Sequence, residues 1–550
     1  MAVADDIKSA IARALEGAGV GASDVPLEHP SDLSHGDYAT GIALAKAKEA
    51  GTSPRMLAEK IVSNVGAIPG VEKIEIAGPG FINFSLAREI FGSAVETART
   101  ADMWGAGSAK TGKKIMVEYT DPNPFKEFHI GHLMANTIGE SISRLFQFEG
   151  AHIKRANYQG DVGPHVAKGI WGIQKLGLDP KNAAELGKAY VAGARAYEED
   201  ENAKAEIDAI NAKVYNRSAE EINKIYDEGR AATLAHFEEL YSILGTKFDF
   251  YFFESETAPV GIELIQKHPE VFEESEGARV FKGSHTRVFI TSKGLPTYEA
   301  KELGLAQMKR GRMEADSYLT VTASEQDGFF KVVYEAIEKV LPEMHGKLVH
   351  RSHGMMRFAE GKMSSRTGNV ITGESLLQDL IESAKERAAE SRADDKEKLA
   401  QQVAVAAIKY QVLKQATGKN IVFDREKALS LEGDSGPYLQ YAYARTQAIS
   451  LKAGEGEIHA KADPSVSPNT VMRFIPRFPE IVARAADHLE PHIVTTYLIE
   501  LASAFNAWYA QEQILDGTPA AAHKLAVVEA VGRTLKNGLW ILGIPAPEKM

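Results

Sequence analysis

An apolar strand that runs through a broken turn into a helix is the feature that most constrains the fold of this chain. Residues 114–120 spell KIMVEYT, an apolar and β-branched run that is typical of a buried parallel strand. The turn Asp121-Pro122-Asn123-Pro124 ends this strand, and a helix is predicted to begin near His129. Strand, loop and helix in this order form the first unit of a doubly wound, nucleotide-binding sheet.

A chain of 550 residues predicts two to four domains, and three regions differ in pattern. Residues 1–108 are predicted to form an α+β module, with helices over 5–17 and 39–50 and a hairpin of strands over 71–76 and 81–86. Residues 109–394 are predicted to form an α/β, doubly wound parallel-sheet (Rossmann-like) catalytic domain, with a helical insertion at about 182–245. Residues 395–550 are predicted to be an all-α helix bundle, in which 471–489 is one of the helices.

Composition narrows the cellular setting and the partners. The chain has no cysteine, which excludes disulfides, thiolate zinc sites and cysteine nucleophiles and fits the reducing cytoplasm. No signal peptide or membrane span is predicted, so no membrane partner is expected. The formal net charge of −12 has the wrong sign for a simple nucleic-acid binder. Any RNA surface must therefore be a local cluster of basic residues on an acidic body.

Two histidines at the start of the predicted helix indicate a phosphate site. His129 and His132 are three residues apart, so they share one face of the first helical turn, where backbone N–H groups and the helix dipole favour anions. Gly131 between them allows the adenine or ribose of a nucleotide to approach the backbone closely. The ATP-binding prediction also includes Gly160 and Asp161, which follow the next apolar stretch at 153–158.

A glycine-bounded loop far downstream supplies the matching lysine. Lys362, Met363 and Ser364 lie in the segment GKMSSRTGN at 361–369, the lysine loop, and Met355 lies just ahead of it. The pair H-I-G-H and K-M-S-x-x, in this order and at this separation, resembles the signature of class I aminoacyl-tRNA synthetases. The resemblance implies that ATP activates an amino acid, with Lys362 stabilising the leaving pyrophosphate, before the amino acid passes to tRNA.

Several longer blocks narrow this resemblance to the arginyl-tRNA synthetase family. They are VEYTDPNPFKEFHIGHLMANTIGE, HGDYATGIALAKA, AGPGFINF, SGPYLQYAYAR, KMSSRTGNV and LKNGLWILGIPAPEKM. The second lysine of the class I loop is replaced by Ser365, as arginyl enzymes often show. The resemblance implies that Lys126, three residues before His129, takes over its role, and Arg366 is the other candidate.

The same resemblance implies an arginine pocket. Glu118 and Glu302 would bind the guanidinium, Tyr298 would line the pocket, and Asn123 and Gln326 would hold the amino and carboxylate ends of the substrate. Carboxylates suit a guanidinium, which is planar, always charged and rich in donors. Tyr298 and Glu302 are one helical turn apart and can therefore face one pocket. Glu302 departs from the family, whose members often carry Asp at this position.

Aromatic and basic residues outside this domain are candidates for tRNA contact. By resemblance, Phe81 and Asn83 would stack on and read a base at the tRNA elbow. In the helical region the candidates for anticodon bases are Tyr441, Tyr443, Arg445, Trp508 and Tyr509. The expected partners are tRNA(Arg), L-arginine and ATP with Mg²⁺, without a protein metal site, and the resemblance suggests a monomer.

Two other functions remain open from the sequence. One is another class I synthetase, such as the glutaminyl or the cysteinyl enzyme, although the cysteinyl enzyme needs a zinc that cysteines ligate. The other is a synthetase-like protein that binds tRNA without catalysis, a reading that missing histidines or a missing Lys362 would favour. Arginine-dependent exchange of pyrophosphate into ATP separates these functions.

Overall fold

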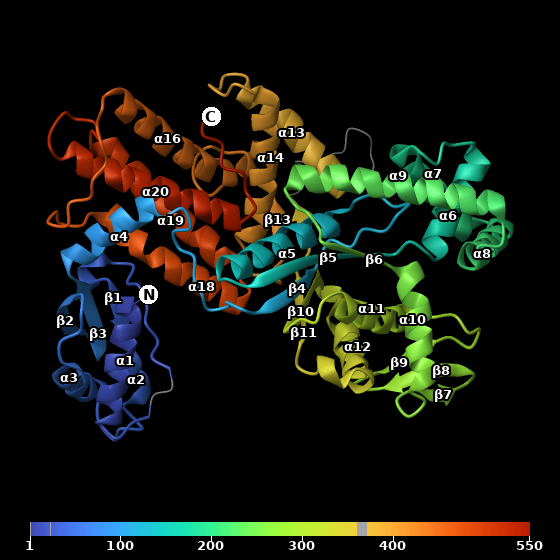
Figure 1. Ribbon diagram of the computed structural model, residues 1–550, viewed down its shortest axis with the longest axis horizontal. Coiled ribbons are helices and arrows are strands. Elements are labelled where there is room, and N and C mark those ends of the chain that lie inside the picture. The colour runs from blue at the N-terminus through green and yellow to red at the C-terminus, as the bar shows by residue number, and fades with distance from the viewer. Residues whose placement is uncertain (1, 22–23, 360–370) are drawn as a thin grey trace. The chain divides into compact units, whose positions relative to one another are not determined.

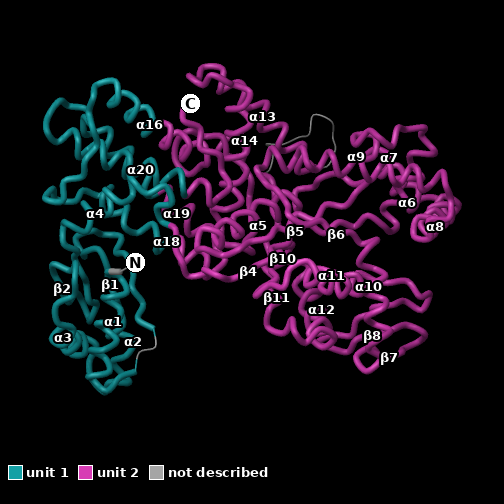
Figure 2. The backbone as a smooth tube through the Cα atoms, viewed as in Figure 1, with its two compact units in different colours: residues 1–105, 445–481, 500–537 teal, residues 106–444, 482–499, 538–550 magenta. Residues whose placement is uncertain are grey.

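The computed structural model describes residues 2–21, 24–359 and 371–550 (Figure 1). The chain packs into two compact units (Figure 2). Unit 1 comprises residues 1–105, 445–481 and 500–537, and unit 2 comprises residues 106–444, 482–499 and 538–550. In the described ranges, no helix has the length and apolar character that a bilayer span requires. The boundaries predicted near residues 108 and 394 stay predictions, because these units combine segments from distant parts of the sequence.

Five parallel strands form the central sheet of unit 2. Their order across the sheet is β11 (Leu348–His353), β10 (Ser317–Ala323), β4 (Lys114–Glu118), β5 (His152–Gln159) and β6 (Phe250–Phe253). The chain starts at β4, adds strands on one side and then returns to add β10 and β11 on the other. This is a doubly wound sheet whose order reverses between β4 and β10, and it confirms the predicted fold class.

Helices follow the strands of this sheet as a doubly wound fold requires. They are α5 (Ile130–Phe148), α6 (Pro164–Leu176), α10 (Glu254–Lys267), α11 (Tyr298–Arg312) and α12 (Asp327–Val340). Between β5 and β6 the chain also forms α7 (Ala183–Glu199), α8 (Glu201–Asn216) and α9 (Glu220–Leu244), in the region where helices were expected. A small antiparallel sheet of β7 (Glu273–Ser275), β8 (Ala278–Lys282) and β9 (Thr286–Ile290) precedes α11.

Unit 2 also contains the helical segments that follow β11. These are α13 (Gly373–Ala388), α14 (Lys396–Leu413), α15 (Arg425–Ala428) and the short parallel pair β12 (Met356–Phe358) and β13 (Ile421–Phe423). The first turn of α13 lies against the residues that precede α5, since Gly373 N donates a hydrogen bond to Phe128 O at 2.8 Å. A side chain at Gly373 would meet His129 O at 2.8 Å, so only glycine allows this close approach.

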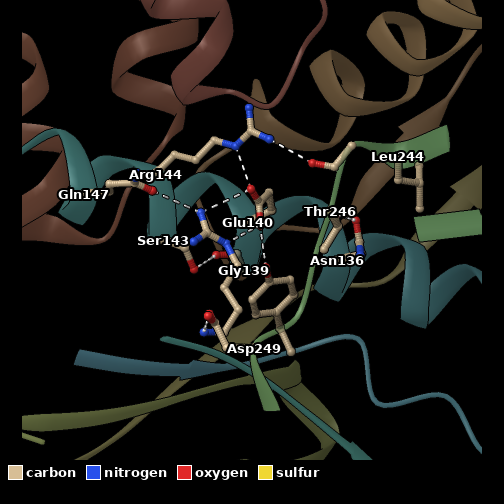
Figure 3. Close-up of polar contacts among 12 residues, drawn as sticks. Asn136, Gly139, Glu140, Ser143, Arg144, Gln147, Leu244, Thr246 and Asp249 are labelled. Carbon is tan, nitrogen blue, oxygen red and sulfur yellow. Dashed lines mark hydrogen bonds and ion pairs between the residues drawn. The ribbon is translucent and has the colours of Figure 1, made fainter. Parts of the chain in front are cut away.

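A buried carboxylate anchors α5 to the sheet and to two distant segments (Figure 3). Glu140 accepts hydrogen bonds from Tyr119 Oη at 2.5 Å, Arg144 Nε at 2.6 Å and Arg155 Nε at 2.8 Å. Arg144 in turn donates to Trp540 O and to Gly245 O, both at 2.8 Å. Burial raises the pKa of Glu140, but the two guanidinium groups outweigh it and hold the pKa below its usual value. We call these side chains the Glu140 hub.

Unit 1 joins the N-terminal module to C-terminal helices. The module contains α1 (Ala2–Glu16), α2 (Ile42–Lys46), α3 (Pro54–Val65), α4 (Arg88–Thr100) and an antiparallel sheet of order β1 (Tyr38–Thr40), β3 (Phe81–Leu86), β2 (Val71–Ala77). The remaining helices of the chain are α16 (Gly436–Glu455), α17 (Thr470–Phe474), α18 (Phe478–His488), α19 (His492–Gln511) and α20 (Ala521–Ile541). Asp37 pairs with Arg473, and Asn537 Nδ2 donates to Asp102 O at 3.0 Å.

Two predicted helices differ from the structure. The helix expected over 39–50 begins only at Ile42, because Tyr38–Thr40 pairs with β3 and Asp37 accepts a hydrogen bond from Leu86 N at 2.8 Å. The helix expected over 471–489 is broken into α17 and α18 by a 3₁₀ turn that contains Pro476, whose nitrogen cannot donate a helical hydrogen bond. The hairpin of β2 and β3 is confirmed.

Candidate active site

A cavity of about 460 Å³ opens where the strand order reverses, at the carboxyl ends of β4 and β10. Ligands of open α/β sheets bind at this place, and the volume suits a small-molecule site. The cavity is lined by residues from several elements. They are 118 at the end of β4, 120, 121 and 123 after it, 129, 131, 132 and 135 at the start of α5, 158 and 160 at the end of β5, 254 at the start of α10, 287 in β9, 298, 299 and 302 in α11, 321–323 at the end of β10, 326, 329 and 330 after it, and 353 at the end of β11.

The loop that leaves β4 is held in an unusual conformation. Thr120 and Asp121 have φ of 83° and 48°, a region that β-branched residues such as Thr avoid. Polar contacts fix both: Asn136 Nδ2 donates to Thr120 Oγ1 at 3.0 Å, and Tyr158 N donates to Asp121 Oδ1 at 2.7 Å. The loop therefore turns sharply at the edge of the cavity and keeps its carboxylate and amide side chains there.

The two histidines close a reciprocal cap on α5. His129 is the N-cap, His129 N donates to His132 Nδ1 at 3.2 Å, and His132 N donates to His129 Nδ1 at 3.4 Å. Because both Nδ1 atoms accept, the proton of each neutral ring is assigned to Nε2. Partial burial and the Lys126 charge lower the pKa of His129, and burial lowers the pKa of His132 further. Two neutral N–H donors thus remain at the N-terminus of the helix.

Carboxyl groups form another part of the cavity wall. Glu118 ends β4, and its Oε2 lies 2.6 Å from Lys309 Nζ of α11. Glu302, two turns before Lys309 on α11, lines the cavity, and burial followed by the Glu118 charge raises the pKa of Glu302 to about 8. Burial and the Glu118 charge likewise raise the pKa of Asp121 well above its usual value. This wall suits a cationic ligand.

A second buried ion pair borders the cavity. Glu254, at the start of α10, lies 2.5 Å from Lys301 Nζ, and both side chains are buried. Tyr298 is 64% exposed, and the Lys301 ammonium lies 5.1 Å from the centroid of its ring. Asn123 Oδ1 accepts from Gly160 N at 2.9 Å, and a Cβ at Gly160 would meet that oxygen at 2.5 Å. The backbone of Gly160 therefore lies directly against the cavity wall.

Family models match nearly the whole chain. The model described as "tRNA synthetases class I (R), catalytic domain" matches residues 96–425. The chain belongs to this arginyl class I synthetase family. The synthetase also matches "Arginyl tRNA synthetase N terminal domain" over residues 3–86 and "DALR anticodon binding domain" over residues 439–550.

Relatives of this synthetase match it from end to end. It is 30% identical over 552 residues to an arginine–tRNA ligase of Clostridium perfringens, which covers 95% of this chain and 96% of the relative. It is 31% identical over 547 residues to that of Clostridium beijerinckii, with coverage of 95% and 96%. Among solved structures, Thermus thermophilus arginyl-tRNA synthetase is similar with a TM-score of 0.84 at 26% identity, covering both chains fully.

The structure brings together the five residues predicted for arginine and four of the six described residues predicted for ATP. The cavity of the synthetase is lined by Glu118, Asn123, Tyr298, Glu302 and Gln326, and by His129, Gly131, His132 and Gly160. Lys362, Met363, Ser364 and Arg366 lie outside the described residues.

Three predicted residues do not line the cavity. Lys126 lies with its ammonium 5.3 Å from the centroid of the Tyr190 ring, and burial lowers its pKa. Asp161 is buried and accepts hydrogen bonds from Arg230 Nε at 3.0 Å and from Ser255 N at 2.9 Å, so its carboxylate holds the fold around Gly160. Met355, between β11 and β12, is 44% exposed.

The residues predicted for tRNA contact differ in their exposure. Phe81 is 42% exposed at the start of β3, whereas Asn83 on the same strand is buried. Tyr441 is 36% exposed on α16, and Tyr443 is buried. Arg445 donates to Asn506 Oδ1 at 2.5 Å and lies 5.1 Å from the centroid of the Tyr509 ring, and Trp508 is half-buried next to it on α19. Their exposure thus favours Phe81, Tyr441 and Tyr509 as the residues whose rings a base can reach.

Some residues of the cavity were missed from the sequence. Asp121 follows a strand end, which is a usual place for functional carboxylates in such sheets, and this signal was available. Lys309 lies seven residues after Glu302, so helical spacing could have placed it on the same face of α11. His353 at the end of β11 and Glu254 at the start of α10 carry no local signal, because only the folded sheet brings them to the cavity.

Proposed function

We propose that this synthetase is an arginine–tRNA ligase. It activates L-arginine with ATP to arginyl-adenylate and pyrophosphate, and it then transfers arginine to the 3′ end of tRNA(Arg). The observation that carries the proposal is one cavity that is lined both by two histidines at a helix N-terminus and by carboxyl groups. The histidines suit phosphate and the carboxyl groups suit a guanidinium.

At the ATP end, the chain supplies positioning and charge rather than covalent chemistry. The substrate carboxylate attacks the α-phosphorus, and the bond to pyrophosphate breaks. His129 and His132 donate from Nε2 to phosphate oxygens, where negative charge increases in the transition state, and Gly131 and Gly160 let the nucleotide lie against the backbone. Lys126, with Lys362 and its loop neighbours Met363, Ser364 and Arg366, neutralises the leaving group. ATP enters with Mg²⁺ as its counter-ion.

At the arginine end, α11 and the loop after β4 determine the substrate. Glu302 and the carboxyls at the end of β4 face the guanidinium, and Tyr298 covers the pocket from its exposed position. Asn123 and Gln326 hold the amino and carboxylate groups of arginine between the guanidinium site and the histidines. This order places the substrate carboxylate on the side of the cavity where ATP binds.

The other regions bind tRNA. Residues 1–108 bind the elbow through Phe81 and Asn83, and the helical region 395–550 binds the anticodon through Tyr441, Arg445 and Trp508. Support comes from the family models for the N-terminal and anticodon-binding domains and from the exposure of Phe81 and Tyr441. The enzyme works as a monomer in the cytoplasm, where its family acts in protein biosynthesis.

The deciding experiment is exchange of labelled pyrophosphate into ATP, measured with L-arginine, with and without tRNA(Arg). We expect exchange that depends on arginine and is absent with glutamine. Exchange that depends on another amino acid instead would show that the chain is a class I synthetase of a different specificity. Binding of tRNA without exchange under any condition would make it a synthetase-like binding protein.

A further inference from the structure

The carboxyl wall of the cavity holds more acids than internal cations. Glu118, Asp121 and Glu302 all line it. Lys309 Nζ lies 2.6 Å from Glu118 Oε2, and the two side chains are only 7% and 3% exposed. Such a buried pair stays together, because separating it would leave two charges without partners in a low-dielectric site. Lys309 therefore stays paired with Glu118.

Of the other cations near this wall, Lys301 is held in a buried ion pair, whereas Arg287 is 41% exposed and more loosely paired. Lys301 lies 2.5 Å from Glu254 Oε2, and Arg287 lies 3.7 Å from Glu299 Oε1. In the parts of the chain that the structure describes, Glu302 has no hydrogen-bond or ion-pair partner. Asp121 accepts from Tyr158 N at 2.7 Å, which is a neutral donor. Glu302 and Asp121 are thus two half-buried carboxyl groups without an ion pair of their own, near a Lys309 ammonium that is paired with Glu118.

Two such groups next to the Glu118 charge cannot both stay ionised at neutral pH. The environment is set by every element around Glu302: β4, the loop after it, β5, α10, α11 and α12. The titratable groups that these elements contribute are Glu118, Asp121, Tyr158, Glu254, Glu299, Lys309 and Tyr334. The raised pKa of Glu302, about 8, agrees with a carboxyl that holds a proton in the free protein at pH 7.

We propose that Lys309 is a positioning residue that neutralises Glu118 permanently, so that arginine binds through Glu302 and Asp121 and displaces one proton to solvent. The proton leaves a carboxylic acid as the guanidinium, already charged, takes its place, so the charge of the wall is unchanged. This inference rests on the proposed function. It divides the acids of the pocket: one carboxylate serves the fold, and the other two form a site for a single further cation.

Proton release is measurable directly. L-arginine is titrated into the full chain by calorimetry at pH 7 in phosphate and in Tris, whose ionisation enthalpies differ, and the difference in heat gives the number of protons exchanged. We expect release approaching one proton at pH 7 and little release at pH 9, where Glu302 has already lost its proton. Arginine affinity should accordingly increase as pH rises from 6 to 8 and then level off. No proton release at pH 7 would overturn the inference.

Two variants separate the roles of the acids. Glu302→Gln should abolish most of the proton release and weaken arginine binding roughly tenfold or more. The double variant Glu118→Gln/Lys309→Met removes an internal pair of zero net charge, and replacing a buried pair in this way often leaves stability unchanged. It should keep the proton release, because Glu302 and Asp121 remain in place. If it loses as much affinity as Glu302→Gln, Glu118 itself binds the guanidinium and the inference is wrong.

The single variant Lys309→Met leaves Glu118 unpaired. We expect loss of this cation to raise the pKa of Glu302, so that arginine affinity levels off at a higher pH than in the parent; an unchanged pH dependence of arginine affinity would contradict a neutralising role for Lys309. Failure of the proposed function gives a different result. In that case the parent chain shows no heat with arginine in either buffer and no arginine-dependent exchange.

Discussion

The reciprocal cap of His129 and His132 allows the chemical and structural roles of one histidine to be separated. In His132, Nδ1 accepts from His129 N at 3.2 Å, and Nε2 is the donor left for a ligand in the cavity. The amide oxygen of an asparagine takes the place of Nδ1 and preserves the cap but not the donor. The longer glutamine places its amide near Nε2 and preserves the donor but not the cap.

The two variants are expected to change different quantities: His132→Asn lowers exchange activity, and His132→Gln lowers stability. A hydrogen bond to a charged phosphate oxygen contributes about 1.5–3 kcal/mol, so His132→Asn should lower kcat/KM for exchange roughly 10- to 150-fold. Its unfolding free energy should stay within about 0.5 kcal/mol of the parent. His132 is the N3 partner of the cap, and loss of its hydrogen bond from His129 N costs about 0.5–1.5 kcal/mol. His132→Gln should therefore lose stability by about this amount and keep exchange within a few fold.

The assays are pyrophosphate exchange with saturating arginine and tRNA(Arg), and urea unfolding followed by circular dichroism. Both histidines have a lowered pKa, so exchange in the parent should not fall between pH 8 and pH 6 through their protonation. The reasoning is refuted if His132→Asn exchanges at the parental rate. It is equally refuted if His132→Gln loses activity and keeps its stability, because the functional nitrogen would then be Nδ1.

Four further outcomes are expected. Lys126→Ala should slow maximal exchange far more than it raises the KM for ATP, because its charge acts in the transition state; the same pattern in Arg366→Ala, with Lys126→Ala near the parent, would place the compensation in the lysine loop. Glu140→Gln should destabilise unit 2 by about 3–5 kcal/mol in urea unfolding, since it leaves two buried guanidiniums without a counter-charge, whereas Arg195→Gln, at an exposed ion pair, should change stability by less than about 0.5 kcal/mol. Phe81→Ala should raise the KM for tRNA roughly 5- to 150-fold through loss of about 1–3 kcal/mol of stacking, without loss of stability, and an unchanged KM would remove it from the interface. Exchange should be near background without tRNA, and full exchange in its absence would contradict this.

The parts of the fold that the sequence predicted are those with strong local signals. The run 114–120 and the Pro-rich turn after it predicted β4 and α5, and alternation predicted the hairpin of β2 and β3. Strand β1 was missed because its residues are compatible with a helix, and only pairing with β3, 40 or more residues later, decides otherwise. Pro476 should have broken the predicted helix at 471–489, since a proline inside a helical pattern removes a hydrogen bond.

The site was predicted by a different kind of signal. Motif resemblance named five arginine residues, and the structure places all five on one cavity, although their contact with arginine remains a prediction. Motif resemblance did not identify residues that affect the site by neutralising or positioning another residue. Lys309 is such a residue: its role depends on a 2.6 Å contact with Glu118, which comes from a strand almost 200 residues earlier in the chain. The charges around Glu118 can be counted only in the three-dimensional structure, so the sequence alone did not reveal that Glu118 is paired.

Helix α5 is the element through which we expect tRNA binding to affect the active site. One end of this helix carries the histidine cap, and Arg144, twelve residues after His132, donates to Trp540 O in the C-terminal segment. Residues 538–550 pack in the same unit as the cavity. We expect a displacement of that segment to reach the histidines through the Glu140 hub and α5. Coupling of this kind must be reciprocal: if tRNA increases the affinity for ATP and arginine, these ligands increase the affinity for tRNA by the same factor.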